Sequence, residues 1–116
     1  MGVATALLSL VVLRTMYYVF AMIRSWRNAA SRRLWDDGKF NQFRGLDFDI
    51  ALELLASLNA AGSLNDLSPL RSVGLHRLKG DRKNQWAMRV NGRWRICFEF
   101  RDGDAHDVEV VDYRKG

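Results

Sequence analysis

The chain has 116 residues, a formal net charge of +5 and a single cysteine, Cys97. This length corresponds to one domain with a modest hydrophobic core. A lone cysteine excludes an intramolecular disulfide framework, and a thiol inside a strand is usually a small buried apolar group in a reducing compartment. We therefore expect a cytoplasmic protein of one domain.

The first 23 residues are almost wholly apolar, with Arg14 as their only charge. A secretory signal would carry positive charge before the apolar run and a small-residue cleavage site after it, and neither is evident. A transmembrane helix would place Arg14 near the bilayer centre at a cost of about 2.5–3.5 kcal/mol. A third interpretation is a misplaced start, with Met22 as initiator. It predicts an apolar extension over 1–21 and a folded domain over 22–116.

Two helices are predicted after a short first strand over Met22–Trp26. The first helix begins at Asn28, a good N-cap, and ends near Asp37 before Gly38. A polar and aromatic loop over 39–45 follows. The second helix has Asp47 or Asp49 as N-cap and Gly62 as its end, and its residues at helical spacing form one apolar stripe. These stripe residues are Ile50, Ala51, Leu54, Leu55 and Leu58.

The clearest strand signal is a β-hairpin over 86–100, preceded by a short strand over 75–78. Alternate residues of both arms are apolar, and Asn91-Gly92 is typical of a type I′ turn with positive φ at both central residues. The alternation assigns Trp86, Met88, Val90, Trp94, Ile96, Phe98 and Phe100 to a buried face, and Arg89, Arg93, Arg95, Glu99 and Arg101 to the opposite face.

A turn over 102–104 and a last strand over 106–112 complete the order β-α-α-β-β-β-β. This order predicts an α+β fold in which two helices pack on one face of a small, largely antiparallel sheet.

Charge is unevenly distributed along the chain. Residues 71–101 contain nine basic and two acidic residues, whereas the remainder contains nine basic and eleven acidic residues. Such a basic segment indicates a polyanionic partner, although a solvated charged surface is the simple alternative. The groups suited to phosphate are His76, Lys79, Arg82, Lys83, Arg89, Arg93, Arg95, Asp112, Tyr113 and Arg114.

Several other chemistries lack their motifs. The two histidines and one cysteine show no metal-ligand spacing, and neither a glycine-rich phosphate loop nor a nucleophile elbow is present. RNA supplies its own nucleophile, the 2′-hydroxyl, so that its cleavage needs only a base, an acid and charge stabilisation. We therefore expect no metal, no cofactor and no small-molecule ligand.

Four segments occur together in one order: LHRLKGDR over 75–82, NGRWRI over 91–96, DGDA over 102–105 and DY over 112–113. Together with Trp86, this combination resembles the HigB-type killer toxins of the RelE-like superfamily of toxin–antitoxin modules. The resemblance implies a microbial-RNase-like fold and a ribosome-dependent mRNA endonuclease. It also implies a helix-turn-helix antitoxin of the HigA type, through which alone the toxin would reach operator DNA.

The resemblance extends from Met22, whose following residues look like the usual start of the family; this favours the misplaced-start interpretation. By position it implies catalytic roles for His76, Lys79, Arg95, Asp112 and Tyr113, while Arg82, Lys83, Arg89, Arg93 and Arg114 would bind RNA.

One position departs from the family pattern. The C-terminal motif commonly continues with histidine, and this chain has Arg114, which cannot exchange protons at neutral pH. The proton-transfer role would then pass to Tyr113, His76 or Lys79. Two alternatives therefore stay open: a non-catalytic RNA- or ribosome-binding module, and a membrane-tethered protein.

Overall fold

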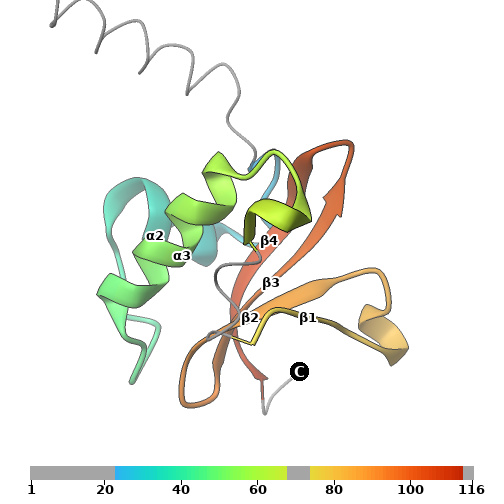
Figure 1. Cartoon of the computed structure of the whole chain (residues 1–116). Coiled ribbons are helices and arrows are strands. Elements are labelled where there is room, and N and C mark those ends of the chain that lie inside the picture. Colours follow the sequence, from blue (N-terminus) through green and yellow to red (C-terminus); the bar gives the residue numbers. More distant parts are fainter. Residues whose placement is uncertain (1–22, 68–73, 114–116) are drawn as a thin grey trace, which may run out of the picture.

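A computed structural model describes residues 23–67 and 74–113 of the chain (Figure 1). The predicted N-terminal extension, the loop around Pro69, the cation at Arg71 and Arg114, which is predicted to bind RNA, lie outside the described residues. The helices are α2 (Ala29–Asp37), α3 (Phe48–Ala60) and a short 3₁₀ helix, η2 (Gly80–Arg82). The strands are β1 (His76–Arg77), β2 (Trp86–Asn91), β3 (Trp94–Arg101) and β4 (Asp104–Asp112).

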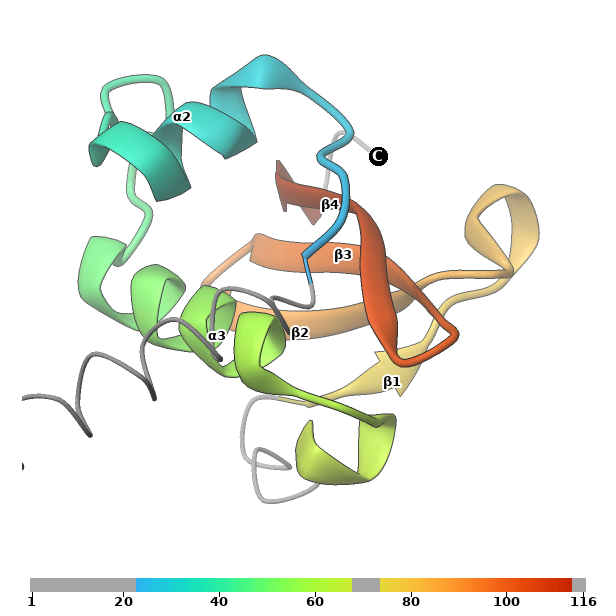
Figure 2. The same cartoon turned by 90° about the horizontal axis from the view of Figure 1, so that it is seen from above.

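The four strands form one antiparallel sheet in the order β1-β2-β3-β4, and α2 and α3 lie on the same face of it (Figures 1 and 2). This arrangement confirms the predicted α+β architecture. Each strand pairs with the strand that follows it in the sequence, which is the simplest connectivity for an antiparallel sheet. Within the described ranges no helix is long and apolar enough to span a bilayer.

The predicted first strand over Met22–Trp26 is wrong as a regular strand. The described part of it makes two isolated parallel bridges to β4, Ile23 with Ala105 and Trp26 with Val108. A continuous ladder between this segment and β4 does not form because β4 bends between the two bridges. At the bend Asp107 has a φ of 52°, and the β3–β4 register shifts beside it.

Both helices begin at the predicted caps. The Asn28 side chain accepts a hydrogen bond from the Ser31 backbone N–H at 2.8 Å, and Asp47 accepts one from Ile50 at 3.1 Å. Gly38 ends α2 with a φ of 68°, as expected for a left-handed cap. The predicted end of α3 at Gly62 is one residue late, because Ala61 caps the helix with an extended backbone that does not require glycine.

The hairpin has the predicted faces but a different turn. Asn91 pairs with Trp94, so Gly92 and Arg93 are the central residues of the turn. Among Asn91, Gly92 and Arg93, only Gly92 has a positive φ, 50°. Glycine at the first central position is the pattern of a type II′ turn. Asn91 is held in β2 because its amide bonds to a distant loop, donating to the Gly45 carbonyl and accepting from the Asp47 N–H, both at 2.8 Å.

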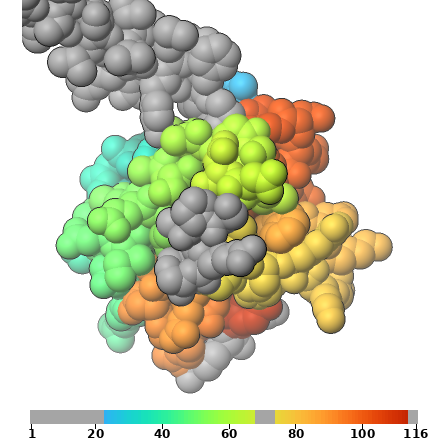
Figure 3. Space-filling model, in the orientation of Figure 1, coloured from blue at the N-terminus to red at the C-terminus, as the bar shows by residue number. Residues whose placement is uncertain are grey.

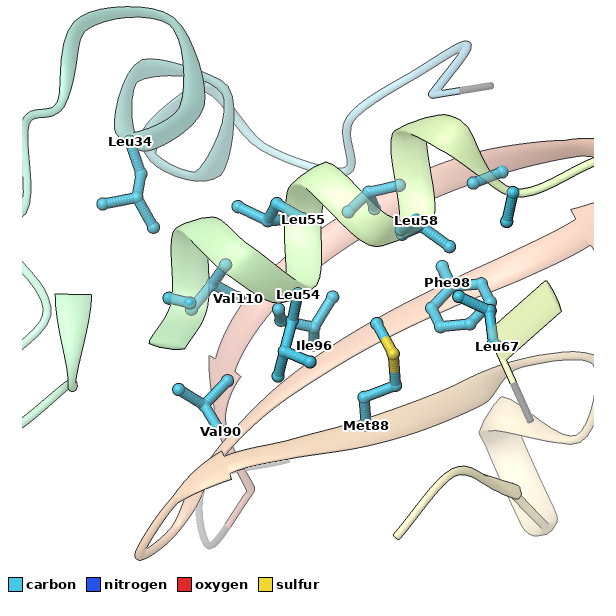
Figure 4. Packing of buried hydrophobic residues seen from close by; sticks show 14 of the residues in the cluster. Leu34, Leu54, Leu55, Leu58, Leu67, Met88, Val90, Ile96, Phe98 and Val110 are labelled. Carbon is cyan, nitrogen blue, oxygen red and sulfur yellow. The ribbon is translucent and has the colours of Figure 1, made fainter. Parts of the chain in front are cut away.

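The main core lies between the helices and the sheet (Figure 4). Leucines of α2 and α3 pack against the predicted inward-facing residues of β2, β3 and β4. Each fully buried side chain of this size contributes about 1.5–3 kcal/mol through removal of apolar area from water. The central members are Leu34, Leu54, Leu55, Leu58, Met88, Ile96, Phe98 and Val110.

Ser31 is a buried polar residue that the sequence pattern does not reveal. Its hydroxyl accepts a hydrogen bond from the Val110 backbone N–H at 3.0 Å. Val110 lies on the edge of β4, beyond the bridge between Trp26 and Val108. Among the described residues, its backbone N–H therefore has no strand beside it on that edge to accept a hydrogen bond, and Ser31 of α2 supplies the acceptor instead.

Candidate nucleic-acid interface

The face of the sheet away from α2 and α3, which we call the open face, is lined differently from the core. Successive side chains of a strand point to opposite faces, so the residues that alternate with the core positions belong here. Leu78, Ala87 and Cys97 form a small second apolar cluster on this face. The open face comprises His76, Leu78, Ala87, Arg89, Arg95, Cys97, Glu109 and Val111.

Cys97 behaves as the sequence predicts for a thiol inside a strand. It is buried, and burial raises the pKa of its thiol to about 11 because the thiolate would lose its hydration. The Arg82 charge lowers this pKa and the Glu109 charge raises it, each by a smaller amount. The thiol is therefore a neutral packing group at physiological pH.

Arg95 and Tyr113 come together at the end of the open face nearest the hairpin turn. The Arg95 guanidinium carbon lies 5.8 Å from the centroid of the Tyr113 ring. Tyr113 follows β4 and is attached to the turn by its backbone N–H, which donates to the Arg93 carbonyl at 2.9 Å. The ring is 43% exposed. A cation and a phenol therefore share one accessible surface.

The Arg95 side chain does not extend freely from the strand. Its Nη1 donates to the Gly92 carbonyl at 2.8 Å and to the Trp94 carbonyl at 3.0 Å. Nη1 carries two of the five donors of a guanidinium, so these bonds leave the Nε–Nη2 edge unused. That edge presents two parallel N–H groups, the geometry that suits bidentate binding of a phosphate. The two carbonyls thus fix the orientation of the group.

Asp112 lies on the other side of the same strand end. It pairs with Trp94 in the β3–β4 register and lines an open groove of about 440 Å³ between β4 and the loop over 41–44. Arg44 and Arg93 also line this groove. The loop is held there by Trp94, whose indole N–H donates to the Arg44 carbonyl at 2.8 Å and whose ring meets Phe43 edge-on.

Arg44 lines the same groove and is a further candidate site residue, although the sequence pattern indicates only a connecting loop over 39–45. The available signal is the alternation of aromatic and polar residues in Phe40-Asn41-Gln42-Phe43-Arg44, a pattern that suits nucleic acid. Its position beside Arg93 depends on the Trp94 hydrogen bond across fifty residues, which no local pattern encodes.

His76 occupies a different part of the open face. It pairs with Ala87, and Arg89 with Arg95, so that two strand spacings and two residues separate His76 from Arg95, roughly 12 Å between Cα atoms. The His76 Nδ1 lies 2.6 Å from the Gly74 carbonyl oxygen. A carbonyl can only accept, so Nδ1 carries the proton, and Nε2 is the basic nitrogen of the neutral ring.

The loop over 79–85 follows β1 and carries Lys79, Arg82 and Lys83. Lys79 and Lys83 are exposed, whereas Arg82 is half-buried, with its Nη1 3.1 Å from Glu109 Oε1. The structure thus brings Arg95 and Tyr113 together on the open face, with Arg93 and Asp112 in the adjoining groove, and places His76 and this loop farther along the sheet.

Ion pairing leaves most of the predicted phosphate-binding cations available. The four ion pairs of the described part of the chain involve Arg24, Arg27, Arg82 and Arg101. Across residues 23–67 and 74–113, no cluster of three or more His, Cys, Asp or Glu side chains could hold a metal ion. The predicted site cations that take part in none of the four ion pairs are Lys79, Lys83, Arg89, Arg93 and Arg95.

The fold and this cationic face define the class of protein. A helix-covered, four-stranded antiparallel sheet with an exposed basic face is the architecture expected of a RelE-like toxin, and a family model described as the RelE-like toxin HigB of type II toxin–antitoxin systems matches residues 24–114. The endoribonuclease HigB of Proteus vulgaris is 32% identical over 92 residues, covering 79% of this chain and 99% of the relative. The chain belongs to the HigB-like family of type II toxins.

Proposed function

We propose that this toxin is an endoribonuclease that cleaves mRNA on the ribosome and so blocks translation. The observation that carries the proposal is the pair formed by Arg95 and Tyr113, with the guanidinium 5.8 Å from the exposed ring on a face whose cations are mostly unpaired. The similarity to an endoribonuclease of Proteus vulgaris supports the same activity. Because the proposed substrate is translated mRNA, we expect the protein to act in the cytoplasm.

The proposed reaction is transfer of a phosphodiester to the neighbouring 2′-oxygen. The 2′-hydroxyl loses its proton to a base and attacks phosphorus, the bond to the 5′-oxygen breaks, and that oxygen gains a proton. The products are a 2′,3′-cyclic phosphate and a 5′-hydroxyl end. The groups of this chain suffice for the step without a resident metal or cofactor.

Roles follow from position on the open face. Arg95 stabilises the charge that accumulates on the phosphate oxygens, because its guanidinium is held in place before the substrate arrives. Tyr113 orients the 2′-hydroxyl or removes its proton, and Asp112 acts from the groove side of the same strand end. His76 and Lys79 lie farther away and contribute by proton transfer or phosphate binding on the flanking RNA.

The RNA path proposed here runs across the open face and into the groove. Arg89 and Arg95 are cross-strand neighbours, and Arg93 connects this row to Arg44 at the groove. Base stacking on exposed aromatic rings and phosphate contacts by arginine are the usual components of such a path. Lys83 extends the proposed binding surface, and Arg82 and Arg114 are further cations predicted from the sequence to bind RNA.

The test is the production of new mRNA ends. After brief induction of the full chain, primer extension on a reporter mRNA should show discrete 5′ ends that appear only where the mRNA is translated. The same RNA without ribosomes should stay intact. Inhibition of translation without new ends would instead identify a non-catalytic ribosome-binding module, the alternative that Arg114 favours.

The proposed partner is a helix-turn-helix antitoxin, through which the toxin reaches operator DNA. Membership of a type II family implies a protein antitoxin that binds the toxin directly. Co-expression of the adjacent small gene should suppress the new mRNA ends and restore growth. Persistent cleavage in the presence of that gene's expressed product would refute this pairing.

A further inference from the structure

Glu109 is an acidic residue on a face that otherwise gathers cations. Its side chain is only 13% exposed and receives three groups: Arg82 Nη1 at 3.1 Å, Arg27 Nε at 3.7 Å and the Asn28 amide at 3.4 Å. Two arginines contact this one carboxylate, and a mostly buried charge costs free energy unless it is paired and hydrogen-bonded.

The Arg82 contact connects two distant parts of the sheet. Arg82 belongs to the loop over 79–85, which joins β1 to β2 and projects from the edge of the molecule (Figures 2 and 3). Glu109 belongs to β4, in the same cross-strand row as Ala87 and Cys97. The Arg82 and Glu109 charges both act on the pKa of the Cys97 thiol, which lies in this row.

The loop is braced around this side chain. Besides Glu109, Arg82 Nη1 donates to the Gln85 amide oxygen at 2.9 Å, and the Gln85 backbone N–H donates to the Arg82 carbonyl at 2.8 Å. The Gln85 carbonyl in turn accepts from the Leu78 N–H at 2.8 Å, which closes the base of the loop. The exposed cations carried by this braced loop are Lys79 and Lys83.

We propose that Glu109 is a positioning residue for RNA binding: through Arg82 it fixes the 79–85 loop so that Lys79 and Lys83 meet the RNA backbone. This inference rests on the proposed function. Arg82 Nη1 is already engaged by Glu109 and Gln85, so Arg82 serves the loop rather than phosphate. Arg27 shares the Oε1 atom of this carboxylate with Arg82, and the Asn28 amide donates to its Oε2 atom.

Removing the Glu109 charge should change the affinity for RNA in the direction opposite to the one expected from simple electrostatics. Removing an acidic charge from a cationic surface should strengthen binding to RNA. If Glu109 positions the loop, Glu109→Gln should instead weaken binding, and the salt slope of the affinity should fall by about 1 to 2 as lysine–phosphate contacts are lost. Arg82→Gln should have the same effect, and the double variant should be no weaker than either single variant, because the two residues act as one unit.

The experiment measures binding of the full chain to bacterial ribosomes carrying a reporter mRNA, by sedimentation at several salt concentrations. Single-turnover cleavage should show a raised half-saturating concentration and a smaller change in maximal rate, a split that general unfolding would not produce. Glu99→Gln is the matched control, since it also removes one carboxylate from the sheet but is paired with Arg101 at its own strand end. Its binding should be unchanged or slightly tighter.

Hydrogen exchange reports the brace independently of RNA. In Glu109→Gln, the amides of Leu78 and Gln85 should lose protection while that of Ile96 in β3 keeps it. Tighter binding by Glu109→Gln, or weakening confined to Arg82→Gln, would overturn the proposal and assign Arg82 to phosphate. If Glu109→Gln fails to fold, Arg82→Gln tests the proposal in its place: it should bind RNA more weakly and lose protection at the amides of Leu78 and Gln85. A wild-type chain that neither binds nor cleaves refutes the proposed function, and the positioning role falls with it even where the exchange result shows the brace.

Discussion

The two faces of the sheet have opposite compositions. The helix-covered face presents large apolar side chains such as Met88, Ile96 and Phe98, all fully buried. The open face has small apolar residues at its centre, Ala87 and Cys97, surrounded by charged side chains. One face therefore supplies stability through buried area, and the other is free to hold charges that water and a polyanion can reach.

This difference indicates how a small domain combines a stable fold with a cationic site. The strands are shared by both faces, since each alternates core and surface residues along its length. Packing on one face fixes the backbone, and the backbone fixes the spacing of cations on the other. Substitutions on the two faces should accordingly separate into those that change stability and those that change RNA cleavage.

The largest expected effect on stability is at Phe98. Phe98→Ala removes the largest fully buried side chain and leaves a cavity under α3, so the free energy of unfolding should fall by about 3–5 kcal/mol. Urea denaturation measures this loss. Phe100→Ala, in the same strand but only partly buried, is the control and should cost clearly less. Equal losses at both positions would mean that the core is not centred on Phe98.

The matching change on the open face is Arg95→Ala. It should slow cleavage by about 100- to 1,000-fold, the scale of losing one preorganised charge donor, or roughly 3–4 kcal/mol of transition-state stabilisation. Its effect on unfolding should be about 1 kcal/mol, from the lost bonds to Gly92 and Trp94. Arg101→Ala, an exposed arginine of the same strand, should cleave at the native rate. A large loss of stability in Arg95→Ala would assign this residue to the fold instead.

Cys97, at the centre of the open face, should make the free energy of unfolding depend on pH. Its raised pKa means that the folded state favours the neutral thiol, so its contribution to stability is complete below about pH 9 and is lost as pH rises toward 11. A rise of the thiol pKa from 9.0 to about 11 corresponds to about 2–3 kcal/mol. Urea denaturation at about pH 8 and pH 11 should show this loss in the wild type and a smaller one in Cys97→Ala. Identical losses would contradict burial of the thiol.

The smallest expected effect is at Arg44, which tests whether the groove belongs to the RNA path. Arg44→Ala should lower the salt slope of ribosome binding by about 1 and leave stability unchanged. Arg32→Ala, on the exposed surface of α2, is the control and should leave the slope unaltered. A slope that is the same in both variants would confine RNA to the open face.

Local features of the fold could be predicted from the sequence, and long-range ones could not. The caps Asn28 and Asp47 act within three residues, and the alternation from Trp86 to Phe100 determines which side is buried. The turn was displaced because the Asn91 amide bonds to residues more than forty positions away. Such a tertiary contact leaves no periodic signal in the chain.

The site shows the same limit. Family resemblance led to Arg95 and Tyr113, whose contact depends on two strand ends meeting. It treated Arg82 as one more cation, since nothing near it in sequence reveals that Glu109, twenty-seven residues later, forms an ion pair with it. Charge along a sequence therefore overestimates the number of cations available to a ligand when strands bring acids beside them.

The most direct test of the division between the faces is the cleavage rate of Tyr113→Phe. This substitution removes one hydroxyl oxygen and keeps the ring beside Arg95, so neither the fold nor ribosome binding should change. Primer extension on a translated reporter mRNA should show cleavage slowed by at least about 100-fold, the scale of losing a positioned acid–base group. Cleavage at the native rate by Tyr113→Phe would contradict the assignment of chemistry to this end of the open face.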